Sequence, residues 1–135
     1  MIIRPFLRSA VTARVAVVAA VVAVLSSVAS AGALPHLKLI KSSPIADTTL
    51  TSSPDAIRLW LSEPAELPGT KIALATEAGA EVGVAPLTRP AAANAPIVAK
   101  IARPLTPGAY KVTWKAMSKD GHVVNGTFGF KVAPK

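Results

Sequence analysis

The chain alternates apolar and polar residues most regularly near its C-terminus, in Ala109-Tyr110-Lys111-Val112-Thr113-Trp114-Lys115-Ala116-Met117. The alternation returns in Thr127-Phe128-Gly129-Phe130-Lys131-Val132. An apolar side chain at every second position predicts a β-strand with one buried face. The segment between the two runs contains Asp120-Gly121, a common turn dipeptide. The sequence therefore predicts a β-hairpin here, with Tyr110 and Trp114 in the protein core.

Outward from this hairpin, the chain back to residue 36 consists of short apolar runs separated by turn and loop signals. Five further strands are expected, at His36–Lys41, Asp55–Leu61, Lys71–Thr76, Glu81–Ala85 and Ile97–Ile101. Segments rich in proline and polar residues predict loops at Pro44–Pro54, Glu63–Gly69 and Pro86–Pro96. No useful helical periodicity occurs in this region, and most of the twelve prolines of the chain lie in it and oppose helix. Seven short strands in about 100 residues predict an all-β fold, an antiparallel β-sandwich.

The first third of the chain has the pattern of a secretory signal peptide. Arg4, Arg8 and Arg14 precede or flank an apolar run at Val15–Leu25, and small residues follow it. This order of charge, apolar run and Ala-x-Ala site is typical of exported proteins. We expect a signal peptide at residues 1–31 and a β-sandwich domain at 32–135, although cleavage after Ala33 fits equally well. An uncleaved membrane anchor is the alternative; after cleavage no stable membrane insertion is expected.

Charge and composition exclude several classes of function. Removal of the three arginines leaves 12 Lys and Arg against 7 Asp and Glu, so the net charge falls from +8 to +5. The basic residues are spread along the strands without an aromatic-interleaved patch, which argues against nucleic-acid binding. The chain has no cysteine, so it has neither disulfides nor thiolate metal sites.

The hairpin turn carries the main candidate for chemistry. Asp120 and His122 lie two residues apart around Gly121, so a short turn can aim a carboxylate and an imidazole at one point. A divalent metal ion accepts both ligand types. The alternative is an ordinary surface hairpin with a solvated histidine. Serine hydrolase and glycosidase arrangements are not evident, so a metal site made of His36, Asp120 and His122 is the only constellation with chemical content. Spacing alone does not show whether His36 reaches the turn.

Three segments between His36 and Val132 carry a family resemblance. The longest and most specific is Leu105-x-Pro107-Gly108-x-Tyr110-x-Val112-x-Trp114-x-x-x-Ser118-x-Asp120-Gly121-His122-x-x-x-Gly126-x-Phe128-x-Phe130-x-Val132. Two shorter segments support it, His36-x-Lys38-Leu39-x-x-Ser42-Ser43-Pro44 and Ile57-Arg58-Leu59-x-Leu61-Ser62-Glu63-Pro64. With these segments, the region resembles the CopC family of periplasmic copper-resistance proteins over essentially its whole length.

The resemblance implies a seven-stranded antiparallel Greek-key, immunoglobulin-like β-sandwich that binds Cu(II) in the bacterial periplasm. It implies copper ligands at His36, Asp120 and His122, where the family's histidine is the first residue of the mature protein and binds through both its amine and its ring. Glu63 matches a family glutamate close to the site and would support the ligands; a loop carboxylate in water is the alternative. The expected function is non-enzymatic buffering or delivery of Cu(II), with an inner-membrane copper transporter as a candidate partner.

This chain departs from the family pattern in two ways. Cleavage directly before His36 would place Pro35 at the last signal position, against the small-residue rule, so the terminal amine is expected upstream of His36 and the Cu(II) site is expected to be weaker. The methionine-rich segment of some members is missing, and Met117 is expected to serve packing rather than Cu(I) binding. Two other functions stay open: an immunoglobulin-like envelope interaction module with weakened or lost copper binding, and a copper-dependent oxidase, which the displaced amine disfavours.

Overall fold

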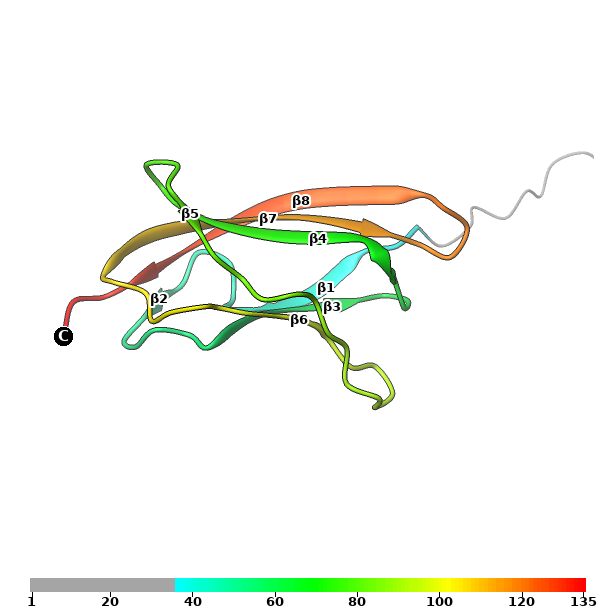
Figure 1. The fold of residues 1–135 in the computed structure, drawn as a ribbon, viewed down its shortest axis with the longest axis horizontal. Coiled ribbons are helices and arrows are strands. Elements are labelled where there is room, and N and C mark those ends of the chain that lie inside the picture. The colour runs from blue at the N-terminus through cyan, green and yellow to red at the C-terminus, as the bar shows by residue number, and fades with distance from the viewer. Residues whose placement is uncertain (1–35) are drawn as a thin grey trace, which may run out of the picture. The chain divides into compact units, whose positions relative to one another are not determined.

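The computed structural model describes residues 36–135. The predicted signal peptide at 1–31, with its cleavage sites after Ala31 or Ala33, lies outside the described residues. Within the described region every regular element is a β-strand (Figure 1). That region therefore contains no helix that could span a membrane. The predicted all-β class is confirmed.

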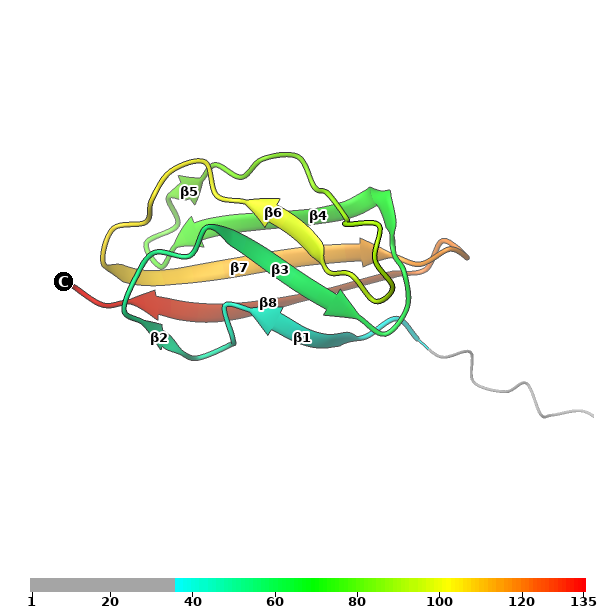
Figure 2. The same cartoon turned by 90° about the horizontal axis from the view of Figure 1, so that it is seen from below.

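The strands form two sheets that pack face to face as a sandwich (Figure 2). The smaller sheet has the order β1-β3-β6, with β1 at Leu39–Ser43, β3 at Ala56–Leu61 and β6 at Ile97–Lys100. The larger sheet has the order β2-β8-β7-β4-β5, with β2 at Thr49–Leu50, β8 at Val123–Val132, β7 at Gly108–Met117, β4 at Glu66–Thr76 and β5 at Glu81–Val82. The longest antiparallel pairing joins β7 and β8, from Gly108↔Val132 to Met117↔Val123.

Strand β2 differs from the sequence prediction in two ways. The described region has eight strands rather than seven, because β2 lies inside the predicted loop at Pro44–Pro54. This strand is also parallel to β8, whereas an entirely antiparallel sandwich was expected. Backbone hydrogen bonds explain both differences: Asp47 N donates to Gly129 O at 2.8 Å and Lys131 N donates to Thr48 O at 2.9 Å. A two-residue strand held by its backbone leaves no side-chain alternation to detect.

Strand β4 also starts earlier than predicted. Residues Glu66–Gly69 were expected to belong to a loop after the preceding strand, yet they form the first part of β4. The pairing with β7 is irregular between Glu66 and Lys71, where the Thr70 hydroxyl donates to Glu66 O at 2.8 Å. The irregular part has no period-two pattern, so sequence alternation identifies only the regular half of the strand.

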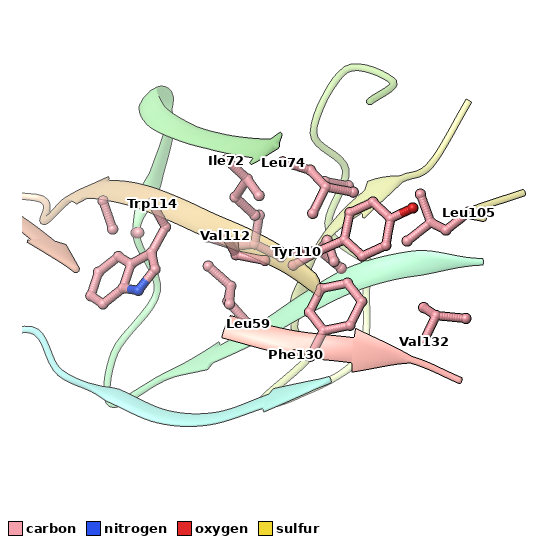
Figure 3. Packing of buried hydrophobic residues seen from close by; sticks show 14 of the residues in the cluster. Leu59, Ile72, Leu74, Leu105, Tyr110, Val112, Trp114, Phe130 and Val132 are labelled. Carbon is pink, nitrogen blue, oxygen red and sulfur yellow. The ribbon is translucent and has the colours of Figure 1, made fainter. Parts of the chain in front are cut away.

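The core lies between the two sheets and is built largely on β7 (Figure 3). Tyr110, Val112, Trp114 and Ala116 are all buried, as the alternation of this strand predicts. The Tyr110 ring stacks on Phe130 of β8 with ring centroids 5.6 Å apart, and its hydroxyl donates to Thr106 O at 2.7 Å. From the smaller sheet, Leu59 packs into the same cluster. The β7–β8 hairpin is therefore anchored along its length.

One end of the sandwich gathers three segments that are distant in sequence. The turn between β7 and β8, the start of β1 and the loop between β3 and β4 all lie there in both views (Figures 1 and 2). We call this the turn end of the sandwich. It is where the candidate residues of the sequence analysis fall.

Candidate metal centre

The turn at residues 118–122 is closed by its own backbone. Ser118 N donates to His122 O at 2.9 Å, and Gly121 N donates to Ser118 O at 3.0 Å. Gly121 has φ +85°, a left-handed conformation that glycine adopts without steric cost. The residue pair Asp120 and His122 is thus carried on a short, defined turn at the end of the longest hairpin.

The structure brings the Asp120 carboxylate and the His122 imidazole into contact. His122 Nδ1 lies 2.7 Å from Asp120 Oδ2. The other carboxylate oxygen, Oδ1, accepts hydrogen bonds from the Ser118 hydroxyl and, at 3.3 Å, from His122 N. Each oxygen of Asp120 therefore has its own partner. The i, i+2 spacing around glycine has the local effect that the sequence predicted.

Hydrogen bonding controls the charge on this carboxylate. The hydroxyl of Ser118 first, and then His122, lower the pKa of Asp120 from 3.8 to about 2. Both bonds favour the ionised form. The side chains of Asp120 and His122 stay 50% and 71% exposed, so solvent and ions reach them. At neutral pH the turn presents a permanent carboxylate beside an accessible imidazole.

The third predicted ligand is at the same end but not in the cluster. His36 is exposed and precedes β1 by three residues. The residues that follow it are anchored: Leu37 is buried in the core, Lys38 N donates to the Ser62 hydroxyl at 2.9 Å, and Ser62 N donates to Lys38 O at 2.8 Å. Within residues 36–135, no three side chains of the His, Asp and Glu type lie close enough to hold one ion. The structure unites Asp120 with His122 and leaves His36 apart from them.

Glu63 lies in the loop between β3 and β4 and is partly buried. With Leu61 and Arg89 it lines a cavity of about 240 Å³. Neither a hydrogen bond nor an ion pair joins it to the turn residues in the described part of the chain. Its expected supporting role therefore stays a prediction.

Met117 is engaged in packing. A Cβ atom added to Gly69 of β4 would lie 2.8 Å from Met117 Cβ, so the methionine side chain covers that glycine.

Ser118 is the site residue to which the sequence pattern gave no role of its own. The sequence pattern that could have identified Ser118 is a hydroxyl residue two positions before an aspartate. This pattern is common in hydrogen-bonded turns and is too frequent to single out one serine.

The donors of the turn suit a divalent ion. One imidazole and one ionised carboxylate are ligands that Cu(II) and related ions accept, and both are accessible. Two donors do not complete a protein site, so a further ligand has to come from elsewhere, and His36 is the remaining histidine. The residues present therefore fit a copper ion if the side chain of His36 reaches the turn.

Comparison with known proteins supplies the family. The family model described as the CopC domain matches residues 39–133. The chain belongs to the CopC family. Its CopC domain thus covers both sheets and the whole candidate turn.

Relatives of this CopC chain include two proteins named copper resistance protein C. That of Xanthomonas campestris pv. juglandis is 33% identical over 112 residues, covering 79% of this chain and 87% of the relative. That of Pseudomonas syringae pv. tomato is 36% identical over 110 residues, covering 76% and 85%. The crystal structure of PcoC, a methionine-rich copper resistance protein from Escherichia coli, matches with a TM-score of 0.62 and 27% identity, covering 72% of this chain and 98% of PcoC. The present chain has two methionines in total.

Proposed function

We propose that this CopC-family protein binds Cu(II) and buffers or delivers it in the periplasm, without catalytic turnover. The observation that supports the proposal most is the 2.7 Å contact between His122 Nδ1 and Asp120 Oδ2 on an exposed turn. It places a nitrogen donor and a charged oxygen donor together in solvent. The names of its relatives, which are copper resistance proteins, favour copper over other divalent ions.

In the proposed site, His36 joins Asp120 and His122 as the third ligand. The segment that carries it lies at the turn end, and His36 is exposed. Binding would therefore require a movement of His36 itself, because the next residue, Leu37, is buried in the core. Glu63, in the neighbouring loop, would support the ligands through the charge of its carboxylate.

Copper titration of the purified mature protein tests the proposal. We expect one Cu(II) per chain, with affinity reduced strongly in His122→Ala, Asp120→Ala and His36→Ala. Asp47→Asn is the matched control, because Asp47 is an exposed carboxylate whose backbone N bonds Gly129 O, and Gly129 pairs with Lys111 near the start of β7, away from the turn that follows the end of β7. Stoichiometric binding that His122→Ala leaves unchanged would reject the assigned ligands.

The starting residue of the secreted protein decides how strong the site is. If His36 were the first residue, its amine would add a nitrogen ligand. An upstream start leaves only side chains, and Pro35 has no N–H that could be deprotonated. We expect mass spectrometry of the exported protein to find a start before His36, together with a weak site.

A second function is favoured by one observation, the lack of a three-donor cluster in residues 36–135. The protein could act as an interaction module that keeps the fold and binds another envelope protein, such as an inner-membrane copper transporter. This function predicts no stoichiometric Cu(II) binding by the purified domain. The same titration separates the two functions.

A further inference from the structure

The hydroxyl group of Ser118 lies beneath the exposed turn. Ser118 follows the last residue of β7 and is 5% exposed, while Asp120 and His122 beside it face solvent. Buried polar residues are few in the described region, namely Ser42, Thr70 and Ser118. A buried hydroxyl needs a hydrogen-bond partner, and the partners that it has show what it holds in place.

The partners of Ser118 are the two candidate donor residues. Its hydroxyl donates to Asp120 Oδ1 and also lies 3.1 Å from His122 O. Its backbone N donates to that same carbonyl at 2.9 Å. The backbone bond closes the turn without help from the side chain. The hydroxyl is therefore free to orient the carboxylate of Asp120.

The orientation of that carboxylate decides what faces the histidine. With Oδ1 held from below by Ser118, Oδ2 points to the imidazole and contacts Nδ1 at 2.7 Å. Without the hydroxyl, Oδ1 would keep only the 3.3 Å bond from His122 N. The exposed side chain of Asp120 would then rotate among several conformations.

We propose that Ser118 is a positioning residue of the metal site, whose buried hydroxyl fixes Asp120 so that the carboxylate and the His122 ring are presented as one preformed pair. The role in metal binding rests on the proposed function. The positioning itself concerns contacts within the metal-free protein. Partners behind metal ligands typically contribute about 10- to 100-fold to metal affinity.

Three variants test this role through Cu(II) affinity, measured by competition with a chelator. Ser118→Ala removes the hydroxyl and is expected to weaken binding by about 10- to 100-fold. Ser118→Thr keeps a hydroxyl and is expected to restore most of the affinity. Ser42→Ala is the matched control, because Ser42 is also buried and its hydroxyl donates to a backbone carbonyl, Pro44 O, at 2.8 Å. Its affinity is expected to equal that of the wild type.

A second readout needs no metal. Long-range ¹⁵N–¹H NMR, at a pH where imidazole is neutral, reports which ring nitrogen carries the proton. In the wild type we expect the proton of His122 on Nδ1, facing Asp120 Oδ2. In Ser118→Ala we expect a mixture of both tautomers. Asp120→Asn keeps the buried hydroxyl and its acceptor oxygen, and its amide group, which donates toward Nδ1, should move the proton to Nε2.

The two readouts separate the proposals. A wild type that binds no copper, with a tautomer that is fixed in it and mixed in Ser118→Ala, contradicts the proposed function and supports the positioning role. Unchanged affinity and an unchanged tautomer in Ser118→Ala overturn the positioning role, even if the wild type binds copper. If Ser118→Ala does not fold, a tautomer that does not respond to Asp120→Asn overturns it instead.

Discussion

Gly126 of β8 shows how closely single residues fit at the hairpin. It pairs with Trp114 of β7, and the indole ring of Trp114 lies over it. A Cβ atom on Gly126 would lie 2.9 Å from Trp114 Cζ2, closer than carbon atoms approach in real structures. The glycine is therefore required by the tryptophan opposite and not by a turn.

Gly126→Ala should destabilise the protein by about 1–3 kcal/mol, the usual cost of overpacking a filled core. Urea unfolding measures this change. Gly83→Ala serves as the control, because a Cβ atom there would meet Ala102 Cβ at an ordinary 3.6 Å. Equal free energies of unfolding for the two variants would contradict the packing argument.

The low pKa of Asp120 predicts which residue type sets the pH dependence of copper binding. Asp120 is held ionised down to a pKa of about 2. Histidine side chains ordinarily take up a proton near pH 6.5, and protons then compete with the metal. Affinity should be constant at higher pH and should fall as the pH drops below about 6.5. Chelator competition from pH 8 down to pH 5 measures it. A decline that begins only near pH 4 would point to carboxylate ligands without histidine.

At the scale of elements, side-chain alternation identified some strands well and missed others. The β7–β8 hairpin and β3 were predicted because each buries every second side chain on one face. Strand β2 and the first part of β4 were missed, because backbone bonds and the Thr70 hydroxyl define them rather than an alternating pattern. Strands that bury side chains can therefore be recognised from alternation in the sequence. A short strand at a sheet edge, or an irregular part of a strand, carries no such pattern.

Strand β2 depends on the turn at Asp47, which has φ 60°. Left-handed backbone costs most residues roughly 1–2 kcal/mol, whereas glycine, asparagine and aspartate adopt it more readily. Asp47→Ala should therefore lower the free energy of unfolding by roughly that amount, and Asp47→Gly should lower it less. Thermal or urea unfolding of the two variants compares them directly. A larger loss for glycine than for alanine would contradict the argument from backbone conformation.

For the whole molecule, the sequence predicted the β-sandwich, because seven alternating or apolar runs had to bury their faces against one another. It also predicted that a short turn can aim Asp120 and His122 at one point, which depends on local spacing; their direct contact was not predicted. It did not place His36, because that depends on how the end of the sandwich is assembled, and it did not single out Ser118, because a hydroxyl residue two positions before an aspartate is a common pattern. The arrangement of the lysines in space was not predicted from the sequence either. They are spread along the sequence, yet register and exposure put Lys71 directly opposite Lys115 on the outer face of the larger sheet.

The turn end joins parts of both layers: β1 begins there in the smaller sheet, and the β7–β8 turn belongs to the larger one. An ion bound by both His36 and His122 would link the two layers. It would also close a loop of 86 residues, the difference between the two positions. Binding of the ion would raise the melting temperature. The gain in the free energy of unfolding is about 2.7 kcal/mol when the ion is present at 100 times its dissociation constant. Calorimetry should show this rise with Cu(II) for the wild type and little of it for His36→Ala. The bound metal would then stabilise the same fold that transports it.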